Sequence, residues 1–200
     1  MNLLIVTQYF WPENFRINDL VTDLVKRGHE ITVLTGLPNY PGGEFAEGYS
    51  WRKGPWRQTY AGATVLRAPL LRRGSCGGVR LALNFFSFAL FGSWRAWFGL
   101  RQSFDAIFVF GASPVTVGIP AIVASRRGKA PILFWVLDLW PESLTAAGGV
   151  RSPLVLGAVD RMVKWIYRRC SRVLVQSRAF IPEMARHGVP QEDIHYFPSW

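Results

Sequence analysis

The sequence is poor in cysteine, and this scarcity limits the compartments and sites it can have. Its two cysteines, Cys76 and Cys170, supply neither a disulfide framework nor a metal-binding spacing. A reducing, cytoplasmic compartment fits this pattern. The N-terminus also lacks the charged and then apolar segments of a signal peptide, because its first apolar run is only as long as a strand.

Motifs that carry common enzyme chemistry are missing as well. The sequence has no GxGxxG after its first apolar run, no Walker A loop, no HExxH and no serine in a nucleophile elbow. Its histidines, His29, His187 and His195, are scattered along the chain. We therefore expect no metal ion and no bound cofactor.

Acidic residues are absent from a long central stretch, although the chain as a whole carries a formal net charge of +10. No Asp or Glu occurs between Gly48 and Phe104, where Arg and Lys recur. Such a basic region favours an anionic partner, namely membrane lipid, nucleic acid or a phosphorylated substrate, although a solvated basic face is the simpler interpretation. No motif for binding RNA or DNA accompanies the charge, so we expect no nucleic-acid partner.

What is present is a regular alternation of apolar runs with helical patterns. Strands are expected at residues 3–7, 30–36, 62–69, 106–111, 131–138, 172–177 and 194–198, and helices at 17–25, 115–127, 153–169 and 179–187. This alternation predicts an α/β fold, a Rossmann-like doubly wound parallel sheet. Ligands in such folds bind at the carboxyl ends of the strands, which directs attention to the residues that follow each strand.

The segment 81–100 is a second unusual feature, because Arg95 is its only charged residue. It is long enough to cross a bilayer, but it lies between two predicted strands of one sheet. A buried crossover helix is the simpler alternative, yet such a helix should have a polar outer face. We favour a third interpretation, a crossover helix whose outer face enters the membrane interface beside anionic head groups. The residues expected at the membrane are Arg72, Arg73, Arg80, Phe88, Phe91, Trp94, Arg95, Trp97 and Phe98.

Four motifs follow one another in the sequence. They are QYFWPENFRINDL at residues 8–20, TGLPNYP at 35–41, FGASPVTVGIPA at 110–121 and VLDLWPES at 136–143. Together with KRGHEITV at 26–33, they resemble the N-terminal domain of the family-four glycosyltransferases of GT-B architecture, over residues 1–200. Within that family they resemble the surface-polysaccharide enzymes of the WbuB and WcaI type.

The resemblance implies one half of a two-domain enzyme. The N-terminal domain of such enzymes binds the acceptor, and the C-terminal domain holds most of the nucleotide sugar. The resemblance also implies a retaining mechanism without a metal ion, and members of the WbuB type are associated with L-fucosamine transfer. The expected acceptor is a polyprenyl-diphosphate-linked sugar. Because the chain ends where its last predicted strand finishes, we expect a missing C-terminal donor-binding domain and an inactive isolated chain.

Asp138 is the main candidate for a catalytic residue. It ends the apolar strand at 131–138, where core packing explains a carboxylate poorly. It is placed to accept the proton of the attacking hydroxyl or to orient the acceptor, although in a retaining mechanism the leaving phosphate can take that proton itself.

Other residues after predicted strands are candidates for binding, and each also has a structural interpretation. Glu13 and Asn14 either bind sugar hydroxyls or serve the start of the next helix. The full set of expected acceptor contacts is Glu13, Asn14, Arg16, Asn39, Tyr40, Ser113, Trp140 and Glu142. Arg178 is expected at the donor phosphate.

The leading hypothesis from the sequence is therefore the acceptor domain of a glycosyltransferase that works peripherally on the cytoplasmic face of the inner membrane. The alternative is a non-catalytic membrane-associated binding or assembly module.

Overall fold

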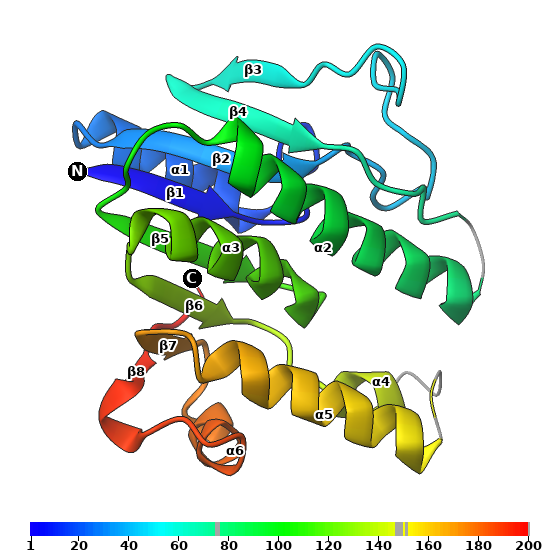
Figure 1. Ribbon diagram of the computed structural model, residues 1–200, viewed down its shortest axis with the longest axis vertical. Helices are drawn as coiled ribbons and strands as arrows, with labels where there is room; N and C mark the ends of the chain where they lie inside the picture. Colours follow the sequence, from blue (N-terminus) through cyan, green and yellow to red (C-terminus); the bar gives the residue numbers. More distant parts are fainter. Residues whose placement is uncertain (75–76, 147–149, 151, 200) are drawn as a thin grey trace.

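An eight-stranded sheet forms the centre of the computed structural model, which describes residues 1–74, 77–146, 150 and 152–199 (Figure 1). The strands are β1 (Asn2–Val6), β2 (Glu30–Gly36), β3 (Arg57–Tyr60), β4 (Ala63–Ala68), β5 (Ala106–Gly111), β6 (Ile132–Val136), β7 (Arg172–Val175) and β8 (Ile194–Tyr196). They are ordered β3-β4-β2-β1-β5-β6-β7-β8, and every neighbouring pair is parallel except β3 with β4. The predicted Rossmann-like doubly wound sheet is confirmed.

Helices cover both faces of the sheet. They are α1 (Arg16–Lys26), α2 (Gly78–Gly99), α3 (Gly118–Gly128), α4 (Glu142–Ala146), α5 (Pro153–Tyr167) and α6 (Ile181–Arg186), and short 3₁₀ turns lie at Val115–Val117, Arg178–Phe180 and Gln191–Asp193. Helices α2, α3 and α5 lie side by side on one face, while α1 lies on the other (Figure 1). The core is accordingly divided into two clusters, one on each side of the sheet.

The sequence analysis did not predict one strand, β3, and one short helix, α4. Strand β3 is short and mostly polar, and it lies at the edge of the sheet, so it has no apolar run to mark it. It pairs with β4 through a tight turn in which Ala61 and Gly62 both have positive φ angles, 47° and 90°. Helix α4 is a single short turn, and it starts directly after Pro141.

The chain reverses its direction of travel across the sheet between β1 and β5. From β1 it runs to β2 and β4 on one side, and from β5 to β6, β7 and β8 on the other. In doubly wound sheets the crevice at such a switch point, outside the carboxyl ends of the strands, is where ligands bind. The fold therefore places the loops after β1, β5 and β6 around the expected site.

Helix α2 is the crossover from β4 to β5, as one of the sequence interpretations expected. Its inner face packs Phe85, Phe88 and Ala96 into the core. In the described part of the chain, no helix has both the length and the apolarity that crossing a membrane requires.

Candidate functional site

The loops at the carboxyl ends of the strands enclose an open pocket of about 340 Å³. It is lined by Tyr9, Phe15, Tyr40, Arg73, Leu81, Phe85, Ala112, Ser113, Asp138, Trp140, Ser143 and Leu144. These residues follow β1, β2, β4, β5 and β6 or belong to the first turns of α2 and to α4. The pocket thus lies at the switch point of the sheet. Its wall combines several aromatic rings with a few charged groups.

Asp138 lies two residues after the end of β6 and is half-buried at the pocket wall. The indole Nε1 of Trp140 donates a hydrogen bond to its Oδ2 at 3.1 Å. Trp140 itself is buried, and its ring meets the ring of Phe85 edge-on at 6.0 Å. No hydrogen bond to the other oxygen, Oδ1, is made by the part of the chain that the structure describes, so this oxygen is available to a hydroxyl in the pocket.

Glu13 is buried, with 6% of its surface exposed, and its carboxylate is occupied by the protein's own backbone. Its Oε1 accepts hydrogen bonds from the N–H groups of Asn39 and Tyr40, both at 2.8 Å. Its Oε2 accepts a bond from the N–H of Phe10 at 3.1 Å. The expected contact with acceptor hydroxyls is therefore corrected: Glu13 ties the loop after β1 to the loop after β2.

Burial gives Glu13 an unusual protonation equilibrium. Loss of hydration raises its pKa to about 7, even though the three backbone N–H groups and the positive charge of Arg67 oppose that shift. Arg67 is fully buried, and its guanidinium donates to the carbonyl oxygens of Gly36 and Trp11. The two buried charged groups therefore hold together the loops that carry the pocket wall.

Asn39 is the second expected acceptor contact that the fold uses internally. Its Nδ2 donates to the carbonyl oxygen of Leu37 at 2.9 Å, and its Oδ1 accepts a bond from Nδ2 of Asn84 at 3.2 Å. Asn84 is a fully buried residue of α2, and its Oδ1 accepts a bond from Nε2 of Gln8 at 2.7 Å. This chain of amides fixes α2 to the loops after β1 and β2, so the acceptor role expected for Asn39 is corrected to a structural one.

Three aromatic rings form the wall of the pocket on the β1 and β2 side. Tyr9 stacks on Phe15 with ring centroids 5.3 Å apart, and both lie within 5.5 Å of the ring of Tyr40. Tyr40 is 43% exposed and lines the pocket, and its expected contact with the acceptor stays a prediction. Tyr9 was missed because aromatic residues after a strand do not reveal which way they point.

Several residues that the sequence suggested as ligand contacts do not line this pocket. Asn14 is exposed, and the helix cap expected of it is corrected, since the N-cap of α1 is Phe15. Arg16 and Glu142 are exposed at the starts of α1 and α4 and do not line the pocket. Arg178 is exposed and lies over the ring of Tyr196 at 4.9 Å, also outside the pocket. Ser113, by contrast, lines the pocket as expected.

The outer face of α2 carries a continuous apolar stripe. We call this set the α2 outer stripe: Val79, Leu83, Phe86, Leu90, Trp94, Trp97 and Phe98, all exposed. Steps of three and four residues place these side chains on one side of the helix. A helix that is apolar on both faces does not suit a solvated surface.

The membrane residues expected from the sequence divide into two groups. Phe88 is fully buried in the core and Phe91 packs edge-on against Trp51, so both expectations are corrected. Arg95 donates to the carbonyl oxygen of Arg67 at 3.0 Å and is partly buried, so the membrane contact expected of Arg95 is corrected as well.

The remaining expected residues keep an exposed surface, with one exception. Trp94, Trp97 and Phe98 belong to the α2 outer stripe, and Arg80 and Arg72 are exposed. Arg73 is the exception, because it lines the pocket and its Nη1 donates to the hydroxyl of Tyr9 at 3.2 Å.

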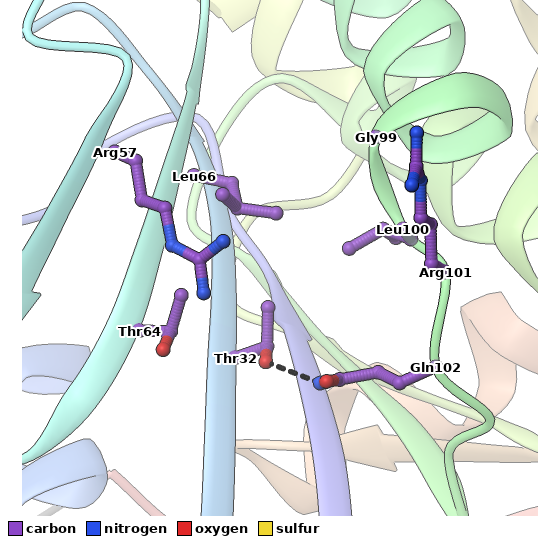
Figure 2. A pocket seen from close by; sticks show the side chains of 8 residues that line it. All are labelled: Thr32, Arg57, Thr64, Leu66, Gly99, Leu100, Arg101 and Gln102. Atoms are coloured by element: carbon purple, nitrogen blue, oxygen red, sulfur yellow. Dashed lines mark hydrogen bonds between the residues drawn. The ribbon is translucent and has the colours of Figure 1, made fainter.

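A second pocket, of about 480 Å³, lies away from these residues (Figure 2). It is lined by Thr32, Arg57, Thr64, Leu66, Gly99, Leu100, Arg101 and Gln102. Gln102 Nε2 donates to Thr32 Oγ1 at 2.7 Å, which links two of the lining side chains (Figure 2). Because Thr32 and Thr64 lie near the amino ends of their strands, this pocket is at the opposite edge of the sheet from the switch point.

Within the described residues, no group of three or more His, Cys, Asp or Glu side chains is arranged to hold a metal ion.

A doubly wound sheet with a pocket at its switch point defines a Rossmann-like ligand-binding domain. The chain belongs to the glycosyl transferase 4-like domain family, whose model matches residues 14–200. It is 25% identical over 188 residues to the putative colanic acid biosynthesis glycosyl transferase WcaI of Escherichia coli K12. That match covers 91% of this chain but only 45% of the relative.

Solved structures of GT-B glycosyltransferases share the fold. The sucrose-phosphate synthase of Thermosynechococcus elongatus aligns over 98% of this chain and 47% of its own, with a TM-score of 0.62 and 12% identity. HepE of Anabaena, determined with UDP and glucose, aligns over 99% of this chain and 44% of its own, with a TM-score of 0.53 and 14% identity. The chain therefore spans less than half the length of each of these proteins.

Proposed function

We propose that this chain is the acceptor-binding half of a glycosyltransferase that moves a sugar from a nucleotide sugar to a lipid-linked acceptor in surface-polysaccharide synthesis. The observation that carries the proposal is the pocket at the switch point, where Asp138 and a wall of aromatic rings meet in a chain of this family. Aromatic faces and single carboxylates suit sugars, because they offer apolar contact and strong hydrogen-bond acceptors together.

The donor side of the proposal rests on the family and its relatives. HepE of Anabaena was determined with UDP and glucose, and this chain shares its fold. We therefore propose a nucleotide sugar as donor, held mainly by a C-terminal domain opposite the pocket, so that the chain alone is inactive. A hexosyl transfer with retained configuration and without a metal ion is the proposed chemistry, and N-acetyl-L-fucosamine is one donor sugar to test.

Asp138 has the central role in this proposal. Its Oδ2 is fixed by the Trp140 indole, so Oδ1 is the atom that meets the attacking hydroxyl. A carboxylate there orients the hydroxyl and accepts its proton as the new glycosidic bond forms, unless the leaving phosphate takes that proton instead.

The membrane side of the proposal rests on α2. Its outer stripe is apolar from end to end, and the exposed Arg72 and Arg80 lie near its start. Aromatic and basic residues together suit the headgroup region of an anionic bilayer. We therefore propose peripheral attachment to the cytoplasmic face of the inner membrane, which brings a lipid-linked acceptor to the pocket.

The test uses the complete protein with a panel of UDP- and GDP-sugars and a lipid-linked acceptor. We expect transfer with at least one donor, and a fall in turnover of about 10²-fold in Asp138→Asn. The Asn side chain keeps an oxygen for the Trp140 indole, so the variant removes the charge and little else. Asp19→Asn, on the exposed side of α1, is the matched control and should leave turnover unchanged.

Two results would contradict the proposal in different ways. Absence of transfer with every donor would favour the alternative of a non-catalytic binding or assembly module. Transfer that survives intact in Asp138→Asn would keep the glycosyltransferase but remove Asp138 from its centre.

A further inference from the structure

We propose that Arg73 is the phosphate-binding residue of the acceptor site, and that it binds the phosphate or diphosphate through which the acceptor sugar is joined to its lipid. This inference rests on the proposed function above. It gives Arg73 a place in the pocket, where the sequence had suggested membrane contact.

Three contacts hold Arg73 at the pocket wall. Its backbone N–H donates to Oδ1 of Asn39 at 3.3 Å, which fixes the loop that carries it. Its Nη1 donates to the hydroxyl of Tyr9 at 3.2 Å, and its Cζ lies 5.2 Å from the centre of the Tyr40 ring. The guanidinium therefore has a defined position before any ligand arrives.

In the described part of the chain, the charge of Arg73 has no ion-pair partner. Among the residues that the structure describes, no carboxylate forms an ion pair with it, whereas the neighbouring Arg72 pairs with Glu44. A guanidinium carries five N–H donors in a fork that matches phosphate oxygens. One of these donors is used by Tyr9, and no other described residue accepts from the guanidinium, so further donors are available to a ligand.

Tyr9 adds a second donor at the same place. Burial raises the pKa of its hydroxyl to about 12, so it stays protonated at neutral pH. Because its oxygen accepts the bond from Arg73, its own proton is directed elsewhere and can reach a phosphate oxygen.

The position of Arg73 relative to Asp138 suits a sugar phosphate. Tyr9, the partner of Arg73, follows β1, whereas Asp138 follows β6, and β5 lies between these two strands. Two strand spacings amount to about 10 Å. Because Arg73, Tyr9 and Asp138 line the same pocket, one sugar phosphate can contact all three.

The same pocket has an apolar wall that suits the lipid joined to this phosphate. Leu81 and Phe85, in the first turns of α2, line the same pocket. Leu81 and Phe85 give the pocket an apolar wall beside Arg73, which suits the first part of a lipid chain attached to a phosphate there.

The experiment measures acceptor and donor KM for the complete protein with a polyprenyl-diphosphate-linked acceptor. We expect Arg73→Ala to raise the acceptor KM by about 10- to 100-fold, the loss of charge-assisted hydrogen bonds, and to leave the donor KM unchanged. Arg73→Lys should recover part of the loss. Arg27→Ala is the matched control, an exposed arginine that pairs with Asp23 at the end of α1 and does not line the pocket, and it should leave both KM values unchanged.

Direct binding separates this inference from the proposed activity. Calorimetry with farnesyl diphosphate as a soluble probe needs no turnover, and we expect wild type to bind it and Arg73→Ala to bind it about 10-fold more weakly or worse. A wild type that transfers sugar but ignores this substitution in both assays would overturn the role of Arg73 and leave the proposed function standing. If the wild type showed no transfer but bound farnesyl diphosphate, and Arg73→Ala weakened that binding, the role of Arg73 in phosphate binding would stand and the proposed activity would fall.

Two other sources of phosphate give different results. If Arg73 met lipid head groups instead, Arg73→Ala would reduce sedimentation with phosphatidylglycerol vesicles and leave the binding of farnesyl diphosphate intact. If it met the nucleotide sugar, the donor KM alone would rise. Either result would overturn the inference.

Discussion

The stability of the protein should fall as the pH rises from about 5 to about 8, and Glu13 should be the cause. Its carboxylate is buried between the loops after β1 and β2, and burial raises its pKa to about 7 from the ordinary value of 4.5. Between these two values the folded state holds a proton that the unfolded state has released. Stability therefore decreases with rising pH across this window, and the decrease is complete above the folded pKa.

The magnitude follows from the two pKa values. A pKa difference of one unit corresponds to about 1.4 kcal/mol, so the full effect is about 3 kcal/mol. Part of it is already present at pH 5, which leaves a loss of about 2–3 kcal/mol in the free energy of unfolding between pH 5 and pH 8.

Glu13→Gln is the variant that isolates this effect. Its oxygen can still accept from the N–H groups of Asn39 and Tyr40, but its NH₂ group would face the N–H of Phe10, which then lacks an acceptor. That loss costs about 1–3 kcal/mol at every pH. The variant should therefore be the less stable protein at pH 5, and the gap to wild type should close or reverse by pH 8.

The assay is urea unfolding of wild type and variant at pH 5 and pH 8. Other titrating groups contribute equally to both proteins, so the difference between them reports Glu13 alone. An identical change in stability with pH in the two proteins would refute the reasoning, because the slope would then belong to other groups.

Three further predictions use the same kind of comparison. Asn84→Leu should lower the free energy of unfolding by about 1–3 kcal/mol in urea titrations, because it leaves the polar partners of a buried amide unpaired. Gly118→Ala should also destabilise, by about 1–3 kcal/mol, since its Cβ would lie 2.9 Å from a ring carbon of Phe134; a melting temperature equal to wild type would contradict this. Trp94→Ser should weaken sedimentation with anionic vesicles, whereas Trp165→Ser on α5 should not, and equal losses would remove the α2 outer stripe from the membrane proposal.

The periodicity of the sequence was enough to predict the fold, because buried parallel strands appear as apolar runs and the helices between them are amphipathic. It was also enough for the place of the pocket, since the carboxyl ends of the strands follow from the strand positions. Asp138, Tyr40, Ser113 and Trp140 all line the pocket that this reasoning located. The edge strand β3 was missed because four mostly polar residues carry no such pattern.

The roles of individual polar residues could not be predicted in the same way. Glu13 and Asn39 looked like ligand contacts because they follow strands, yet their polar atoms are used by backbone and amide groups distant in sequence. Arg73 looked like a membrane residue because it lies in a basic run, yet its partner is Tyr9. Each role depends on a partner 26 to 64 positions away, and a local pattern does not contain that partner.

Helix α2 brings these observations together, because its two faces serve different neighbours. Its outer stripe is exposed, while Asn84 on its inner face donates to Asn39, and Asn39 in turn accepts a bond from the backbone of Arg73. Any tilt or shift of α2 at a membrane would therefore be passed to the loop that holds Arg73 through two hydrogen bonds. The amide chain accounts for the buried Asn84, because it joins the inner face of α2 to the loops after β1, β2 and β4 that form the pocket wall.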